Sequence, residues 1–260
     1  MNKTVNFFKR NLKEVLRDPI IYIFCLGFPL VMLILFQVIG SFIPETPPMF
    51  MLNGLLPAII MFSFSFVMLT MSLLVSKDRE TFFLKRLYSS PMKSYQFVLG
   101  YFLVGLLIGV IQSIVCIITG LIIALISGIE FVPFTQIILL FISQLPILII
   151  SVFLGILFGS IFNDKSAPGI CSIIISISGM LGGCWMPIET MGGFESFCRF
   201  LPFYPSVYFG RITTGAVNQL GVKYTFNSIA YLGIIPIIIF LISSIILSFI
   251  VFKYKMTNDK

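Results

Sequence analysis

Six long apolar stretches alternate with short polar segments along the chain, and none of the six contains an acidic or basic side chain. They are Ile20–Gly40, Gly54–Ser76, Gln96–Ser127, Val132–Phe162, Pro168–Met186 and Tyr224–Phe252. A helix needs about 20 apolar residues to cross the ~30 Å hydrocarbon core of a bilayer. The pattern therefore predicts an all-α integral membrane protein with six transmembrane helices, some of them long enough to tilt or to project beyond the bilayer.

The first 19 residues form a separate element ahead of the first span. Val5, Phe8, Leu12, Val15 and Leu16 recur at helical spacing, and the basic side chains occupy the opposite face. This pattern predicts an N-terminal amphipathic helix in residues 1–19 at the membrane interface, ended by Asp18-Pro19. The remaining residues, 20–260, then form one transmembrane domain.

The composition excludes a soluble globular domain, because only 10% of the residues are charged and a soluble surface needs roughly 25%. Of the 17 Lys and Arg residues, all but Arg199, Arg211 and Lys223 flank the spans on one side. The positive-inside rule then places both termini in the cytoplasm, and an even number of spans is consistent with this because it puts the termini on the same side. We interpret the net charge of +7 as contact with anionic lipid, without a nucleic-acid partner.

Several classes of chemistry are disfavoured by what the sequence lacks. Ionisable groups at membrane depth mark most proton and ion pathways, so the bare spans argue against a gradient-driven carrier. Sodium held by carbonyls at broken helices is the one such route left open. The chain has no histidine, no Gly-x-x-x-x-Gly-Lys-[Ser/Thr] loop and no evident nucleophile–base pair. We therefore expect no metal site, no cofactor bound by this chain and no enzymatic activity of its own.

A charged segment at about 77–91 follows the second span. Its acidic residues Asp78 and Glu80 come early, as in the first turn of a helix, and Ser89-Ser90-Pro91 ends it. The segment predicts a short cytoplasmic helix that either docks a soluble partner or lies on lipid headgroups.

The segment between the fifth and sixth spans, at about 187–210, is rich in aromatic residues. Gly182-Gly183 breaks the preceding span, and Trp185, Tyr204 and Tyr208 lie close by. This composition fits either a re-entrant helical segment in the outer leaflet or an aromatic belt at the interface. Cys184 and Cys198 lie toward the same face, but their spacing does not show whether they meet in a disulfide.

Two glycine pairs predict close helix packing. Gly105 and Gly109 lie in the third span, and Gly155 and Gly159 lie in the fourth. Small residues four positions apart let the backbones of membrane helices approach each other.

The order of these features resembles the ABC-2 type transporter permeases, the membrane subunits of bacterial ABC exporters. The matching elements are the interface helix Phe7–Asp18, the stretch Lys77-Asp78-Arg79-Glu80-Thr81 with Leu84-Lys85-Arg86-Leu87 and Ser90-Pro91, and a late pattern of glycine, proline, glutamate and arginine. That late pattern runs from Gly182-Gly183 through Pro187-Ile188-Glu189 to Arg199-Phe200-Leu201-Pro202 and Pro205.

The resemblance implies that residues 77–91 form the coupling helix that contacts an ATPase. The residues it assigns to this role are Asp78, Arg79, Glu80, Leu84, Lys85, Arg86, Leu87 and Pro91. Phe82-Phe83 departs from the usual Gly-Thr of the family, which affects the docking geometry. The outer residues that it assigns to a cap over the pathway are Gly183, Trp185, Pro187, Glu189, Arg199, Pro202 and Pro205.

The resemblance also implies a homodimer or close heterodimer of permeases in the bacterial cell membrane. Two ATPase subunits below would bind ATP and Mg. The cargo would be a hydrophobic or amphipathic compound, such as a drug, a peptide or a lipid-linked molecule. The alternative is a non-transporting immunity or sensor protein with an outer binding surface.

Overall fold

The computed structural model describes residues 3–19, 22–43, 46–81 and 92–258, and within them it contains helices and no strands. The elements are α1 (Lys3–Val15), the π-helix η1 (Tyr22–Gly27), α3 (Phe28–Phe42), η2 (Pro48–Phe50), α4 (Leu52–Glu80), α6 (Ser94–Ser127), α7 (Phe134–Ile161), α8 (Ala167–Leu181), η3 (Ile188–Thr190), α9 (Gly193–Cys198), α10 (Phe203–Thr213) and α11 (Ser228–Asn258).

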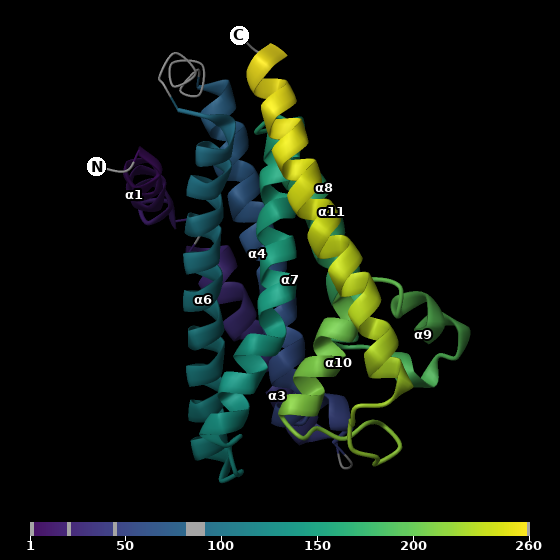
Figure 1. Ribbon diagram of the computed structural model, residues 1–260. Coiled ribbons are helices and arrows are strands. Elements are labelled where there is room, and N and C mark those ends of the chain that lie inside the picture. The colour runs from purple at the N-terminus through teal and green to yellow at the C-terminus, as the bar shows by residue number, and fades with distance from the viewer. Residues whose placement is uncertain (1–2, 20–21, 44–45, 82–91, 259–260) are drawn as a thin grey trace.

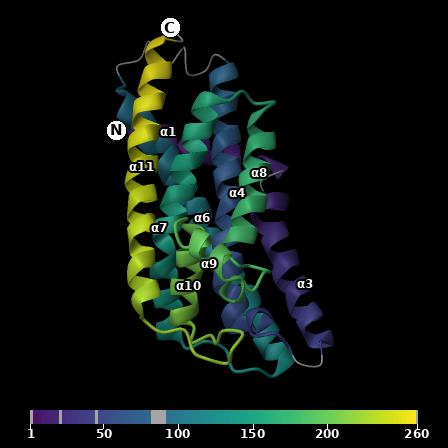
Figure 2. The same cartoon turned by 90° about the vertical axis from the view of Figure 1, so that its right-hand side faces the viewer.

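The long helices form a bundle around α4, which contacts α3, α6, α7, α8 and α10 (Figures 1 and 2). In its most apolar window 89% of α4 is buried, against 22% in α11, so α4 lies inside and α11 outside. The end of α11, the last turn of α4 and the start of α6 lie at one end of the bundle, called here the terminal end. The opposite end is called the distal end.

Within the part of the chain that the structure describes, five helices are long and apolar enough to cross a membrane: Tyr22–Phe42, Leu52–Glu80, Ser94–Ser127, Phe134–Ile161 and Ser228–Lys255. The fifth predicted span, Pro168–Met186, is shorter than expected. Its helix α8 has 15 residues and ends at Leu181, because Gly182 caps it and Gly183 follows with φ of +69°. At 1.5 Å per residue, α8 is roughly 22 Å long and does not match a ~30 Å core.

Glycines determine how closely α7 approaches its neighbours. A Cβ atom at Gly155 would lie 2.5 Å from the Met68 carbonyl oxygen, and one at Gly159 would lie 2.5 Å from that of Ser72. Both contacts are with the backbone of α4. The main chains of α4 and α7 therefore touch directly at these two glycines. On α6, Gly105 and Gly109 receive the side chains of Val152 and Leu148 of α7.

Helix α1 runs across the bundle and packs on α6 (Figures 1 and 2). Its buried residues are Phe7, Asn11 and Val15, and the Phe7 ring meets Tyr101 edge to face at 4.9 Å. Of the predicted apolar face, Val15 is buried in the protein while Val5 and Leu16 are exposed. The helix therefore has two apolar surfaces, one packed on α6 and one open to the surroundings.

Candidate functional site

The last turn of α4 carries the first residues of the predicted coupling segment. The expectation of a new helix opening after Ser76 is wrong for this part, because α4 continues without a break to Glu80. Charged residues can extend a mostly apolar helix when each one finds a hydrogen-bond or ion-pair partner near the end of that helix. At this helix end they find such partners on α1, α6, α7 and the turn after α7.

Asp78 is the most enclosed of these residues, with 1% of its surface exposed. Its Oδ2 accepts hydrogen bonds from Arg10 Nη1 of α1 and from the Tyr101 hydroxyl of α6, both at 2.7 Å. Oδ1 is buried and has no hydrogen-bond partner among the described residues. A charge-assisted pair of this kind contributes more than a neutral hydrogen bond, so Asp78 fixes α1 and α6 to α4.

Arg79 and Glu80 bind the turn between α7 and α8. Arg79 Nη1 donates to the carbonyl oxygens of Gly159 at 3.0 Å, in the last turn of α7, and of Phe162 at 3.3 Å, which caps that helix. Cations favour this position because helix C-termini present unpaired carbonyls. Glu80 Oε1 accepts from the backbone N–H of Asp164 at 2.8 Å. The last turn of α4 is therefore connected to α1 and α6 through Asp78, to the end of α7 through Arg79, and to the turn after α7 through Glu80.

The other residues assigned to coupling, namely Leu84, Lys85, Arg86, Leu87 and Pro91, lie outside the described residues together with Phe82-Phe83.

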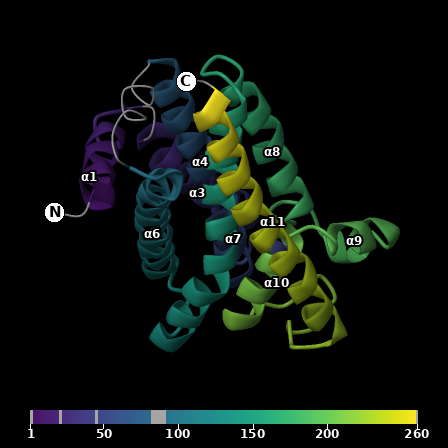
Figure 3. The same cartoon turned by 45° about the horizontal axis from the view of Figure 1, so that its top comes forward.

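The outer segment folds into η3, α9 and α10, and its two longer pieces differ in placement. α10 packs against α4, α7, α8 and α11, with Tyr204, Pro205 and Tyr208 buried. α9 stands out from the side of the bundle, as Figure 3 shows. Pro202 precedes α10 at its N-terminus, and Pro205 meets Gly233 of α11.

Arg211, which the loop count placed with the outer charges, is 3% exposed at the end of α10. Its guanidinium donates to the Gly183 carbonyl at 2.8 Å, to Glu189 Oε1 at 3.1 Å and to the Gly54 carbonyl at 3.3 Å. The Tyr224 hydroxyl bonds both Glu189 and Arg211. Burial raises the pKa of the Tyr224 phenol, so it remains a neutral bridge.

This arrangement, called here the Arg211 cluster, brings together two of the predicted cap residues, Gly183 and Glu189. Arg199 belongs to a separate pair with Glu195 at 2.8 Å. The sequence analysis did not identify Arg211 as a buried residue, because its partner Glu189 is 22 residues away. The one available signal was its position at the end of a helix that contains Tyr204 and Tyr208.

Trp185 and Pro187 follow the break after α8. Trp185 stacks on Phe36 of α3 with the ring centroids 5.9 Å apart, and it meets Phe62 of α4 edge to face with the centroids 4.9 Å apart. This tryptophan therefore fills the space between two helices of the bundle. Pro187 immediately precedes η3, which carries Glu189.

All five cysteines are free and buried, so Cys184 and Cys198 do not form a disulfide. Cys184 Sγ lies 3.2 Å from the carbonyl oxygen of Ala58 on α4, whereas Cys198 packs in the outer cluster with Ile188 and Tyr204. The two thiols occupy different hydrophobic clusters.

A comparison with curated proteins finds no match. Residues 45–253 match a family described as "ABC-2 family transporter protein". The matched region includes α4, the glycine contacts of α7 and the Arg211 cluster, and it covers most of the chain. The chain therefore belongs to the ABC-2 family of transporter proteins.

Proposed function

We propose that the chain is the permease subunit of an ATP-driven exporter, whose ATPase is a separate soluble subunit that binds ATP and Mg. The cargo leaves the cytoplasm and is a hydrophobic or amphipathic compound. Family membership supports the permease role, and membrane-crossing helices support a position in the cell membrane. α1 and the end of α11 lie toward the same end of the bundle, which supports a shared cytoplasmic side for the termini (Figure 1).

The observation that carries this proposal is the position of α4. It is the central helix, and its last turn is connected by Asp78, Arg79 and Glu80 to α1, α6, α7 and the turn after α7. Residues 82–91 continue directly from that turn in the chain. A partner that binds these residues would therefore act on the helix that most of the bundle packs against.

The opposite end of α4 supports a link to the outer segment. The Gly54 carbonyl accepts from Arg211, and the Asn53 carbonyl accepts from the Thr214 hydroxyl. One helix thus joins the proposed ATPase side to the proposed cap. A second permease chain, identical or closely related, completes the transporter in this proposal, and the exposed apolar rows of α3 and α11 are surfaces available to it.

The test combines partner capture with transport. The tagged chain is crosslinked, extracted and examined for a stoichiometric ATPase, and the variant Glu80→Lys/Arg86→Glu is examined in parallel. We expect the variant to lose the ATPase and ATP-dependent transport while keeping its yield in the membrane. Glu130→Lys, an exposed charge reversal at the distal end, is the matched control and keeps both. Transport that survives the double reversal would contradict the coupling assignment.

One observation favours a second candidate, a non-transporting sensor or immunity protein. Phe197 and Phe200 of the outer segment and Leu220, Val222 and Phe226 of the loop between α10 and α11 are exposed and could serve as a binding surface. In that case, vesicles holding the chain and its ATPase would move no substrate when ATP is added. Substitution of Phe200 and Phe226 by serine would then abolish the biological response without changing ATPase capture.

A further inference from the structure

The first membrane-crossing segment is interrupted by a π-helical turn beside a proline. η1 passes directly into α3, and Pro29 lies in the first turn of α3. In an uninterrupted α-helix, the N–H of residue 29 would bond the carbonyl oxygen of Cys25, four residues earlier. Proline has no N–H, and its ring also clashes with that carbonyl. Pro29 therefore deprives the Cys25 carbonyl of its α-helical donor.

A side chain from another helix donates to this carbonyl. Gln112 Nε2, on α6, donates to the carbonyl oxygen of Cys25 and, at 3.1 Å, to that of Ser63 on α4. Carbonyls only accept hydrogen bonds, so the amide nitrogen is the atom that must face them. Gln112 is 1% exposed. Within a bilayer, the carbonyls freed at a proline break need partners on neighbouring helices, and Gln112 is such a partner.

The side chain of Cys25 makes a second, weaker attachment. Its Sγ lies 2.9 Å from the Thr70 hydroxyl and 3.5 Å from the Phe66 carbonyl oxygen, both on α4, and the residue is fully buried. A thiol is a weak donor and a weak acceptor. The amide of Gln112 is therefore the stronger of these polar links between η1 and the bundle.

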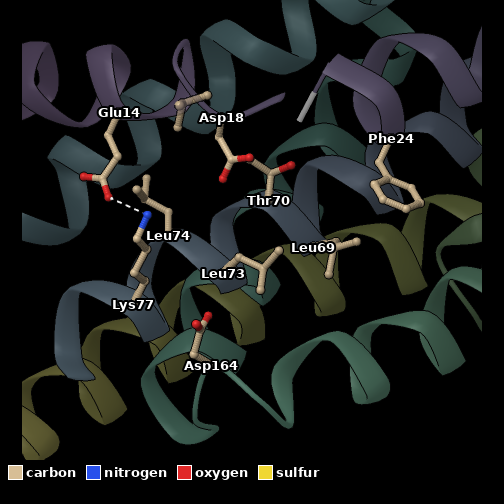
Figure 4. Close-up of a pocket in the computed structure, with 10 residues that line it drawn as sticks. Glu14, Asp18, Phe24, Leu69, Thr70, Leu73, Leu74, Lys77 and Asp164 are labelled. Atoms are coloured by element: carbon tan, nitrogen blue, oxygen red, sulfur yellow. Dashed lines mark ion pairs between the residues drawn. The ribbon is translucent and has the colours of Figure 1, made fainter. Parts of the chain in front are cut away.

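Two features show that η1 can leave this position. Gln112 Oε1 is buried and has no hydrogen-bond partner among the described residues, so the seated arrangement leaves one strong acceptor unsatisfied. A cavity of about 220 Å³ also lies beside η1 at the terminal end, and Phe24 of η1 and Thr70 of α4 both line it (Figure 4). Because protein interiors are otherwise closely packed, this space gives the turn room to move without displacing its neighbours.

We propose that Gln112 is a latch, whose amide holds the π-helical turn η1 seated on α4 and α6. Loss of its bond to the Cys25 carbonyl releases the turn and uncovers the Cys25 thiol. Pro29 makes the latch necessary, because the first span lacks the internal hydrogen bond that would hold its own carbonyl. π-Helical turns inside longer helices are frequent at functional sites. This inference goes beyond the proposed function and does not depend on it.

The test uses the full chain in lipid nanodiscs and the labelling rate of single thiols by methylmercury chloride, which crosses membranes. One chain keeps only Cys25, and a second keeps only Cys171, a fully buried thiol of α8. The gain in mass of the intact chain measures labelling. We expect Gln112→Leu to raise the labelling rate of Cys25 at least tenfold and to change that of Cys171 less than twofold.

Gln144→Leu is the matched control. Gln144 is the other buried glutamine in the described spans, and it bonds Ser206 of α10 instead of η1. Its substitution is expected to leave the labelling rate of Cys25 unchanged. If the Gln112→Leu chain does not accumulate, Gln112→Asn replaces it, because that side chain keeps the amide but is one methylene too short to reach. Protection of Cys25 in the variant, or an equal rise at Cys171, would overturn the latch.

A double variant tests the part played by the proline. Pro29→Ala restores the N–H of residue 29, so the span can hold the Cys25 carbonyl by itself. Gln112→Leu/Pro29→Ala is therefore expected to label Cys25 within threefold of the rate in the unmutated chain. A double variant that labels as fast as Gln112→Leu alone would refute the assignment of the latch to this carbonyl.

Discussion

Arg10 Nη1 lies 2.7 Å from Asp78 Oδ2, and this pair joins the helix that runs across the bundle to the last turn of the helix at its centre. The aspartate is almost fully enclosed, whereas 35% of the arginine side chain is exposed. The two ends of the pair therefore differ in what their removal costs. Loss of Arg10 leaves a buried carboxylate with only Tyr101, but loss of the Asp78 charge leaves an arginine that water can still reach.

We accordingly expect Arg10→Ala to destabilise the chain more than Asp78→Asn. Hydrogen bonds to charged groups contribute about 1.5–3 kcal/mol each, so Arg10→Ala is expected to cost roughly that amount. The measurement is reversible unfolding in mixed micelles with increasing denaturing detergent. Lys77→Ala, which breaks a pair whose lysine is 52% exposed, is the control and is expected to cost about 0–1 kcal/mol. The reverse order would show that the Arg10–Asp78 pair does not hold α1.

The second prediction concerns the glycines of α7. Gly159→Ala places a Cβ atom against the Ser72 carbonyl and is expected to destabilise by about 1–3 kcal/mol through overpacking. Gly169→Ala is the matched control, because nothing lies within 4 Å of its Cβ position in α8. There the change is expected to stabilise by roughly 0.5–1 kcal/mol, since alanine favours a helix over glycine. Thermal unfolding in detergent compares the two, and shifts of the same sign would contradict this packing.

The Arg211 cluster gives a third prediction. Arg211→Leu leaves Glu189 partly buried without its counter-charge and is expected to cost about 3–5 kcal/mol, whereas Arg211→Leu/Glu189→Leu is expected to recover most of that loss. Limited proteolysis provides the measurement, with cleavage between residues 187 and 227 faster in the single variant only. If the double variant is cleaved as fast as the single one, removing the uncompensated charge does not restore the segment, and the ion pair itself is needed to hold it.

The fourth prediction uses the reactivity of Cys198. Burial raises the pKa of this thiol, and the nearby Glu195 raises it further. Because thiolate is the reactive form, labelling by a maleimide begins at a higher pH than for an exposed cysteine. Substitution of the other four cysteines by serine isolates the signal, and the pH profile is compared with that of Cys198 in denaturant. A folded profile at or below the denatured one would contradict the buried position.

Hydrophobic patterning predicted most of the helices, because a span is a property of one continuous segment. Four of the six predicted spans correspond closely to α4, α6, α7 and α11, and the first is divided between η1 and α3. The failures occurred where distant residues decide the outcome. α4 extends to Glu80 because Arg10 pairs with Asp78 and the backbone N–H of Asp164, in the turn after α7, donates to Glu80. Neither partner is near in sequence.

The sites show the same division. Glu189 and Gly183 were singled out from their motif, but Arg211 connects them and was counted only as a loop charge. The spacing of Cys184 and Cys198 left a disulfide open, whereas in the fold Cys184 lies against Ala58 of α4 and Cys198 packs with Ile188 and Tyr204.

The glycine contact between α4 and α7 also determines where the protomer can change shape. With a side-chain-free surface against a backbone at Gly155 and Gly159, sliding by one residue would force Leu154 or Ile156 into the same narrow gap. α3, in contrast, touches α4 through the rings of Phe28 and Phe62, which can turn past each other. We therefore expect α4 and α7 to keep their contact as one unit if the protomer changes shape, and η1 and α3 to be the part that shifts against them.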